Sequence, residues 1–307
     1  MYGAAGQKRV PTDFIKEFLL SFPDNAAQRA IAAFLDVQTA RIDSLMEKKQ
    51  RLITLLDEER QALISRAVTQ GLDPTVPMKE SGLDWMGPVP AHWNVAPLKY
   101  LAEVQSGITV GKKYDSDQTL VERPYLRVAN VQDGYLDLEN IASIEIPLRN
   151  VAQYELQPGD VVVTEGGDFD KLARGYVWDG QIAGCMHQNH IFAVRPKQER
   201  LRSPFLSALM TSLYGRNYFT ATSVQSTNLA CTNRAKLGGF PIPLPSPKEQ
   251  DSICHALELA DIRFQKATQQ LRSTIDRLRE YRSALITAAV TGQLDLREHE
   301  RKLEALA

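Results

Sequence analysis

The chain of 307 residues contains an internal repeat, and this repeat constrains its fold more than any other feature. The segment RQALISRAVTQGLD at 60–73 matches RSALITAAVTGQLD at 282–295 with nine of fourteen positions identical, at an offset of 222 residues. Without a gap, the same offset places Phe18, Pro23, Gln28, Ile31, Leu35 and Arg41 on Phe240, Pro245, Gln250, Ile253, Leu257 and Arg263. A unit of about 56 residues is therefore duplicated.

Each copy of the repeat predicts one long helix. A proline-marked start, FLLSFPDNAAQ in the first copy and FPIPLPSPKEQ in the second, precedes some 45 residues without Gly or Pro. At about 1.5 Å per residue, such a helix is roughly 60 Å long. We therefore expect long helices over 23–70 and 246–292.

Both predicted helices carry apolar residues at alternating spacings of four and three, the pattern of a coiled-coil seam. The seam positions are Ile31, Leu35, Gln38, Ile42, Leu45, Lys49, Leu52, Leu56, Glu59 and Leu63, then Ile253, Leu257, Ala260, Phe264, Ala267, Leu271, Thr274, Leu278, Tyr281 and Leu285. We expect the two helices to pack together antiparallel, because the chain must leave the first, build a domain and return along the second. A generic dimerising coiled coil is the alternative that periodicity alone leaves open.

The segment between the helices predicts a separate mixed domain. Residues 71–90 are rich in Pro and Gly and indicate a linker. Strands are predicted at 125–131, 160–164, 175–178 and 190–194, and a helix is predicted at 203–218. The fold class is therefore α+β, with a mixed α/β domain over 91–245, two long helices that form an antiparallel coiled coil, and a C-terminal tail over 293–307.

The sequence contains no Walker A loop, no GxGxxG after a strand, no HExxH and no nucleophile elbow. The glycine cluster at 164–175 lacks phosphate-loop spacing and indicates a surface turn. Two sets of side chains resemble metal ligands, namely His187 with His190 and the carboxylates Asp115, Asp117, Asp168 and Asp170. Satisfied polar histidines and solvated loop carboxylates are the simpler interpretation, because no complete ligand set is evident. We expect no catalytic residue and no metal site.

Charge is informative only by segment. The net charge of −1 gives no argument for nucleic acid, because strong phosphate binders usually carry a basic excess. Residues 195–236, however, hold seven cations against Glu199 alone, and include the polar run TSVQSTNLACTNR at 222–234. Lys and Arg contact phosphates, and Gln and Asn pair with adenine edges, so this composition suits a DNA-reading surface. The loop SGITVGKKYDSD at 106–117 is a second candidate.

The candidate DNA contacts are polar, basic or aromatic side chains in or beside predicted loops. They are Lys112, Lys113, Tyr114, Arg174, Gln188, Asn189, Asn217, Gln225, Ser226, Thr227, Asn228 and Arg234. For each of them taken singly, a solvated surface group is the alternative.

Several segments, in the same order, resemble the specificity subunits of type I restriction-modification systems. The sharpest lie at 26–73, SGLDWMGPVPAHWNV at 81–95, YLRVANVQDG at 125–134, QPGDVVVTEGG at 157–167 and FPIPLPSPKEQ at 240–250. The resemblance spans nearly the whole chain. It implies that the mixed domain is a DNA target-recognition domain that reads one half of a bipartite site. It also implies that the helices are spacers that dock the modification subunits.

The resemblance further implies a non-catalytic subunit with no cofactor of its own. Adenine methylation would belong to the modification subunits and cleavage to a restriction subunit, so S-adenosylmethionine, ATP and Mg are expected on those partners. A coiled-coil scaffold without DNA specificity is the alternative, but it leaves the large mixed domain without a purpose. The short apolar runs and the lack of a signal peptide predict a cytoplasmic protein without membrane contact.

One departure from the family pattern is the single recognition domain, because a complete specificity subunit has two. By the offset of 222, residues 10–23 take the place of 232–245, so we expect residues 1–22 to be the remnant tail of a missing first domain. Such a tail would expose Phe14, Ile15, Phe18 and Leu19, and contiguous apolar surface usually seeks a partner. We expect either a homodimer or a complementing chain that supplies the other recognition domain.

Overall fold

The computed structural model of the chain describes residues 10–19, 23–83, 85–115, 117–167, 172–225 and 230–294. The chain divides into two compact units, unit 1 with Met1–Leu55 and Lys266–Ala307, and unit 2 with Leu56–Gln265. The division falls inside both long helices, so each unit contains part of each helix.

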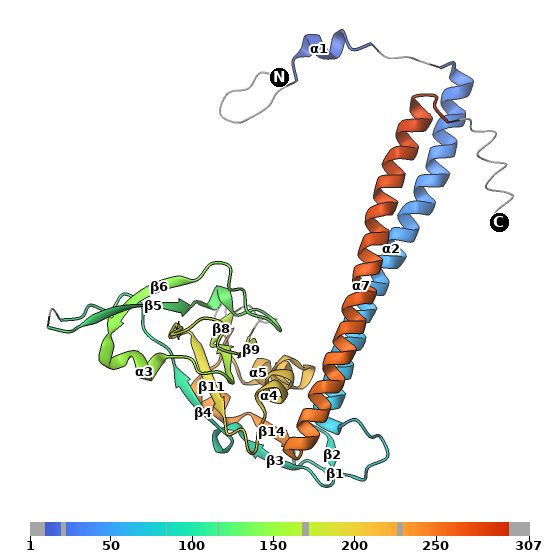
Figure 1. Cartoon of the computed structure of the whole chain (residues 1–307). Helices are drawn as coiled ribbons and strands as arrows, with labels where there is room; N and C mark the ends of the chain where they lie inside the picture. The colour runs from blue at the N-terminus through green and yellow to red at the C-terminus, as the bar shows by residue number, and fades with distance from the viewer. Residues whose placement is uncertain are drawn as a thin grey trace. The chain divides into compact units, whose positions relative to one another are not determined.

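Helix α2 runs over Asn25–Gln70 and helix α7 over Pro247–Val290, and within each unit they lie side by side in opposite directions (Figure 1). In unit 1, Arg282 Nε donates to Asp43 Oδ1 over 2.9 Å. In unit 2, Arg60 Nε donates to Asp261 Oδ1 over 2.5 Å. Each long helix therefore supplies an arginine at the same place in the repeat, and each arginine binds an aspartate of the opposite helix.

The predicted seam agrees with the burial pattern along α7 but drifts along α2. On α7 only Tyr281, which is 50% exposed, departs from the covered face. On α2, Leu45 and Leu52 are each 48% exposed, and Met46 and Ile53, one residue later, are partly covered instead. A helix with 3.6 residues per turn drifts relative to a strict 3.5-residue repeat, which shifts the contact by one residue along a long segment.

A four-stranded antiparallel sheet forms the centre of unit 2, in the order β4-β11-β7-β9. Its strands are β4 (Ala102–Ser106), β7 (Asp160–Thr164), β9 (Gly175–Trp178) and β11 (Ile191–Pro196). Every residue of β7 is buried, with Val161 and Val163 in one apolar cluster and Val162 in another. Both faces of this sheet are therefore covered, which explains the continuous apolar run in the sequence.

Smaller sheets and short helices surround this centre. Strand β5 (Leu120–Leu126) pairs antiparallel with β6 (Ala142–Pro147) and parallel with β10 (Met186–His187). The other antiparallel pairings are β1 (Met78–Glu80) with β2 (Pro88–Pro90), β3 (Asn94–Pro97) with β14 (Pro241–Leu244), and β13 (Ala230–Cys231) with β8 (Gly166–Gly167) and β12 (Val224–Gln225). The short helices are α1 (Thr12–Lys16), α3 (Val151–Tyr154), α4 (Ser203–Thr211), α5 (Leu213–Thr222), α6 (Arg234–Gly239) and the 3₁₀ turns η1 (Leu98–Tyr100), η2 (Val128–Asn130) and η3 (Leu148–Asn150).

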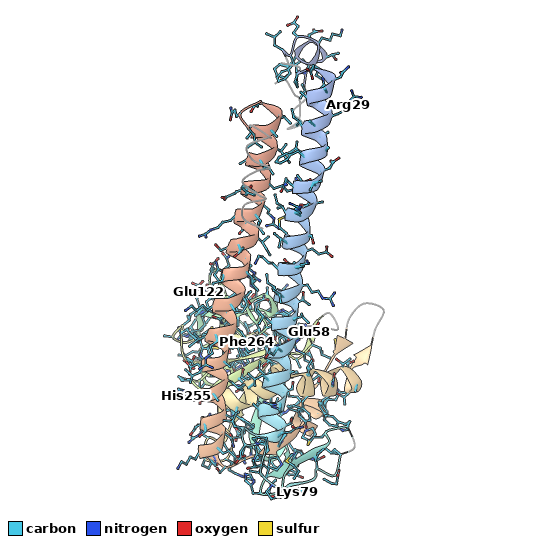
Figure 2. All side chains as sticks on the ribbon, turned by 90° about the vertical axis from the view of Figure 1, so that its right-hand side faces the viewer. Arg29, Glu58, Lys79, Glu122, His255 and Phe264 are labelled. Carbon is cyan, nitrogen blue, oxygen red and sulfur yellow. The ribbon has the colours of Figure 1, made fainter. Side chains whose placement is uncertain are left out.

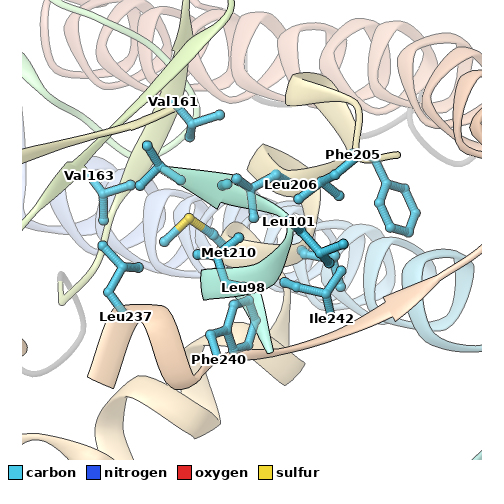
Figure 3. Close-up of a cluster of buried hydrophobic side chains, with 14 of the residues drawn as sticks. Leu98, Leu101, Val161, Val163, Phe205, Leu206, Met210, Leu237, Phe240 and Ile242 are labelled. Atoms are coloured by element: carbon cyan, nitrogen blue, oxygen red, sulfur yellow. The ribbon is translucent and has the colours of Figure 1, made fainter. Parts of the chain in front are cut away.

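The main core of unit 2 joins one face of the central sheet to α4, α5 and α6 (Figure 3). Phe205, Leu206 and Phe240 are among its fully buried side chains. Val68 of α2 and Ile253 of α7 belong to the same cluster and are 0% exposed. The domain is therefore continuous, within unit 2, with one end of the helix pair.

The predicted mixed fold is confirmed, with local differences. The segment 71–90, predicted as a linker, contains the β1–β2 pair, and the strand predicted at 190–194 is β11 at Ile191–Pro196. The strands at 160–164 and 175–178 have the predicted bounds, but β5 ends at Leu126 and the chain turns at 127–130. The Asn130 side chain is buried, at 3% exposed. Its oxygen accepts from Arg127 N, and its nitrogen donates to the Asp137 and Asn140 carbonyls. These side-chain bonds satisfy backbone groups that would otherwise pair with a neighbouring strand. The predicted helix at 203–218 is broken at Ser212, whose hydroxyl caps α5 by accepting from Gly215 N.

Candidate nucleic-acid interface

Several loops meet at one end of the central sheet of unit 2. The antiparallel register brings together the C-terminal ends of β4 and β7 and the N-terminal ends of β9 and β11. The loops there, called the loop cluster below, are 106–115, 126–134, 164–167, 172–174, 187–190 and 230–233. The sheet thus gathers polar segments that lie up to about 125 residues apart in the sequence.

Backbone hydrogen bonds fix two of the loops to each other. Ile108 N donates to His187 O over 2.8 Å, and Asn189 N donates to Ile108 O over 2.9 Å. Gln188 N donates to Leu126 O over 2.9 Å, which adds a third loop. A Cβ on Gly107 would lie 2.2 Å from His187 O, so only glycine allows this close approach.

Two side-chain contacts and one backbone hydrogen bond connect the remaining loops. His190 Nδ1 lies 2.7 Å from Glu165 Oε2, and Thr232 N donates to Glu165 O over 2.8 Å. Arg174 Nη1 donates to Gln132 Oε1 over 3.1 Å. The loop cluster is therefore a connected surface built on the rigid sheet.

The structure places several of the predicted contacts on this surface. Lys112 and Lys113 are exposed and form no ion pair among the described residues. Tyr114 is half-buried, and burial together with the nearby Tyr154 raises the pKa of its phenol. Gln188 and Asn189 are half-buried, and the hydrogen bonds of their backbone hold them in place.

Other predicted contacts fit this surface less well or lie outside the described residues. The Arg174 guanidinium is half-buried and partly engaged by Gln132, and Asn217 is an exposed residue of α5 that no described bond links to the cluster. The backbone of Gln225 lies in β12, paired with Ala230. Residues Ser226, Thr227 and Asn228 lie outside the described residues. These residues remain predictions.

Much of the basic excess in 195–236 serves the fold. Arg195 binds the fully buried Asp160 through two bonds of 2.7 Å, and this contact raises the pKa of Arg195. Arg202 binds Asp251, and Arg216 Nη2 lies 2.5 Å from Asp133 Oδ2 of the loop cluster. Three of the seven cations counted in this segment are therefore paired with carboxylates, and none of these three is among the predicted DNA contacts. The sequence cannot show which cations have a carboxylate beside them in space.

A polar hollow of about 760 Å³ adjoins the loop cluster along β4. Arg234, at the start of α6, and Ser106 and Gly107 of the 106–115 loop are among its lining residues. Lys99 also lines this hollow. Neither Lys99 nor Gln132, which accepts a hydrogen bond from Arg174, is among the contacts predicted from the sequence. Lys99 stands alone in the sequence among apolar residues, so only the folded chain shows that it lines the same hollow as Arg234.

The two histidines considered as metal ligands have different surroundings. His187 is fully buried, its Nδ1 lies 2.9 Å from Ile191 O, and burial lowers the pKa of its imidazole. His190 is 57% exposed beside Glu165. Among the described residues, no group of three or more His, Cys, Asp or Glu side chains is placed to hold a metal ion. Asp115 and Asp117 are exposed, and Asp168 and Asp170 lie outside the described residues.

Comparison with known proteins identifies relatives along most of the chain. It is 22% identical over 278 residues to the StySPI type I restriction enzyme specificity subunit of Salmonella potsdam, and 23% identical over 295 residues to the EcoBI specificity subunit of Escherichia coli. These alignments cover 90% and 94% of this chain but only 57% and 60% of the relatives, so the chain spans somewhat over half of their length. No family model matches the chain.

Solved structures share the fold. A chain of a type I R-M system, described for its complex assembly and conformational transition, superposes with a TM-score of 0.69 at 18% identity, covering 93% of this chain and 64% of that one. The HsdS subunit from Thermoanaerobacter tengcongensis has a TM-score of 0.51 at 17% identity, covering 96% of this chain and 65% of that one.

The fold and the loop cluster define a class of protein in which a mixed α/β domain with polar loops is joined to two long antiparallel helices. Within this class, the chain is a homologue of the specificity subunits of type I restriction enzymes, as the resemblance predicted. In the part of the chain that the structure describes, no helix has an apolar stretch long enough to span a bilayer.

Proposed function

We propose that the chain is the DNA-specificity subunit of a type I restriction-modification system and that unit 2 reads one half of a bipartite site. The loop cluster carries this proposal, because a rigid sheet presents amides and unpaired cations together on one surface. The names of the relatives support it. The chain itself would carry out no chemistry, and S-adenosylmethionine, ATP and Mg would be bound by its partner subunits.

In this proposal, different side chains of the cluster bind phosphates and bases. Lys112, Lys113 and Arg234 are exposed cations and would bind the DNA backbone. Gln188 and Asn189 carry amides that can pair with adenine edges, and their bonded backbone limits the entropy that binding would remove. Gln225, Ser226, Thr227 and Asn228 remain candidates for the same role.

The helices would dock the modification subunits. Val37, Leu45, Leu52 and Leu55 of α2 are each about half exposed and lie within roughly 80° of one another on a helical projection at 100° per residue. An exposed apolar stripe of this kind is typical of a surface that binds another helix. It would be an unfavourable surface to leave in water, which supports a protein partner along unit 1.

Unit 1 would also bind a second recognition domain. By the repeat offset, α1 (Thr12–Lys16) stands where α6 begins in unit 2. The amide of Gln28 donates to Pro23 O over 2.8 Å, just as Gln250 donates to Pro245 O over 3.0 Å. The Gln250 amide makes two further hydrogen bonds to the recognition domain. Its nitrogen donates to Arg200 O, and its oxygen accepts from Arg202 N. The equivalent hydrogen-bonding groups of Gln28 have no partner among the described residues, so this face would be free to bind a second recognition domain.

A coiled-coil scaffold remains the second candidate function, and the exposed stripe on α2 is the observation that favours it. The two functions differ in what the loop cluster does. A scaffold would bind its partners equally well after the cluster is altered.

Duplex binding by purified complexes of the chain with its modification subunit tests the proposal. Lys112→Ala is expected to weaken all duplexes similarly and to reduce the slope of log affinity against log salt by about one. Gln188→Ala is expected to reduce discrimination at one base pair by about 1–3 kcal/mol. If both variants bind every duplex as the unaltered chain does, the scaffold is the correct function.

A further inference from the structure

A hollow of about 350 Å³ lies within unit 2 where α2, α4, β9 and α7 meet. Its apolar lining residues include Leu63, Ile64, Val177, Ala208, Leu257 and Phe264. Figure 2 shows Phe264 on α7, with Glu58 on the neighbouring α2. The volume lies at the small end of the ~300–1,000 Å³ range of specific binding pockets.

The charged residues at this hollow are mostly acidic. Arg60 and Asp261 also line it, but they bind each other, and the second Asp261 oxygen accepts from Gln265 over 2.6 Å. Asp179 is exposed, and the Glu258 side chain is 74% exposed. Asp179 and Glu258 thus lie beside apolar lining residues. Among the described residues Asp179 forms no ion pair, and the only basic group within ion-pair distance of Glu258 is His255, whose Nδ1 is 4.0 Å away.

The acidic and apolar residues of the hollow indicate which kind of partner it can bind. A phosphate backbone or a nucleotide would be repelled by Asp179 and Glu258, so the hollow does not suit DNA. An apolar side chain would cover the floor, and a neighbouring lysine or arginine would meet the carboxylates. We propose that this acidic-rim pocket anchors an apolar side chain flanked by a basic residue of the modification subunit, an inference that rests on the docking role proposed above.

The repeat supplies an internal contrast. Arg282 and Ile286, the counterparts of Arg60 and Ile64, line a hollow of about 400 Å³ in unit 1. The other charged residues there are Asp43 and Arg279, so cations outnumber the one carboxylate. A basic segment would therefore be attracted to the pocket of unit 2 and not to its counterpart.

Binding of the purified modification subunit to the full chain, measured by calorimetry, tests the inference. Glu258→Lys reverses a charge at the pocket, and we expect it to weaken binding about tenfold at low salt and less at high salt. Glu80→Lys makes the same change on β1, where Glu80 is exposed and away from the pocket lining, and is expected to leave binding unchanged. Equal affinities for the unaltered chain and Glu258→Lys would overturn the inference.

A second variant tests the apolar floor. Ala208→Phe adds a ring beside Leu257 and Phe264, and we expect a loss of binding of about tenfold or more with thermal unfolding near that of the unaltered chain. Unchanged binding by a well-folded Ala208→Phe would also contradict the inference. If the unaltered chain fails to bind the modification subunit at all, the proposed docking role fails, and this inference fails with it. DNA binding by the same preparation then shows whether the recognition role survives.

Discussion

Phe18 and Phe240 occupy the same place in the repeat, yet Phe240 is 0% exposed and Phe18 is 54% exposed. The same contrast separates Ile15, 65% exposed, from Leu237, 0% exposed, and Val290, 54% exposed, from Val68, 0% exposed. In unit 2 the mixed domain packs on these positions, and in unit 1 the described residues leave them open. The repeat therefore contains two sets of equivalent positions, and among the described residues only the set in unit 2 is covered.

The largest predicted effect compares the two phenylalanines. Phe240→Ala removes a ring from the main core and should lower the free energy of unfolding by about 3–5 kcal/mol. Phe18→Ala in the isolated chain should change it by about 0.5 kcal/mol or less, because the ring is half in water. Chemical denaturation measures both changes. A similar loss for both variants would mean that the first face is filled as well.

Two cross-element ion pairs give the next contrast. Arg195→Met leaves the fully buried Asp160 without its cation and should destabilise the chain by about 3–5 kcal/mol. Arg282→Met breaks the pair with Asp43, whose side chain is 47% exposed, and should change stability by less than about 1 kcal/mol. Thermal unfolding at low and high salt distinguishes them. If Arg195→Met were as stable as the unaltered chain but weak in DNA binding, Arg195 would belong to the DNA-binding surface after all.

Gln250 and Gln28, which occupy the same place in the repeat, should show a smaller difference in their contribution to stability. Gln250→Ala leaves Arg202 N and two carbonyls without partners and should cost about 1–3 kcal/mol. Gln28→Ala, on an open face, should cost about 0.5 kcal/mol or less. Denaturant midpoints of both variants test this. If a second recognition domain is added and binds unit 1, the loss of stability in Gln28→Ala should approach that in Gln250→Ala.

The smallest effect is a difference in pH dependence. Burial lowers the pKa of the His187 imidazole. As the pH falls through about 6.5, His187 therefore becomes protonated in the unfolded chain but stays neutral in the folded chain. Its contribution to stability is present above about pH 6.5 and is lost as the pH falls through that value. All histidines that the structure describes belong to unit 2, so hydrogen exchange between pH 7 and 5 should increase there first. A His187→Gln chain should lose less stability over the same range, and an identical loss would exclude His187 as the cause.

The sequence predicted the elements whose pattern is local and repeated. The long helices follow from two gap-free segments, and β7 and β9 follow from short apolar runs between turns. The break at Ser212 and the turn at Asn130 escaped prediction. Each depends on a side chain that bonds the backbone, and such bonds compete with regular structure without changing the apolar pattern.

The candidate site was predictable in composition but not in arrangement. The loops with Lys112 and Gln188 were found by their residue types, and the sheet register brings them together. The sequence could not show that Arg195 and Arg216 bind Asp160 and Asp133, because each pair forms between distant segments. Lys99 was missed for the same reason.

Single-base methylation mapping would decide whether this chain selects the DNA sequence that is methylated. Cells would express the modification subunit with the unaltered chain, with the Gln188→Ala chain, or without the chain. We expect a bipartite methyladenine motif that requires the chain, with one position of one half relaxed by Gln188→Ala. A motif that persists unchanged without the chain would contradict the claim that this protein selects the DNA sequence.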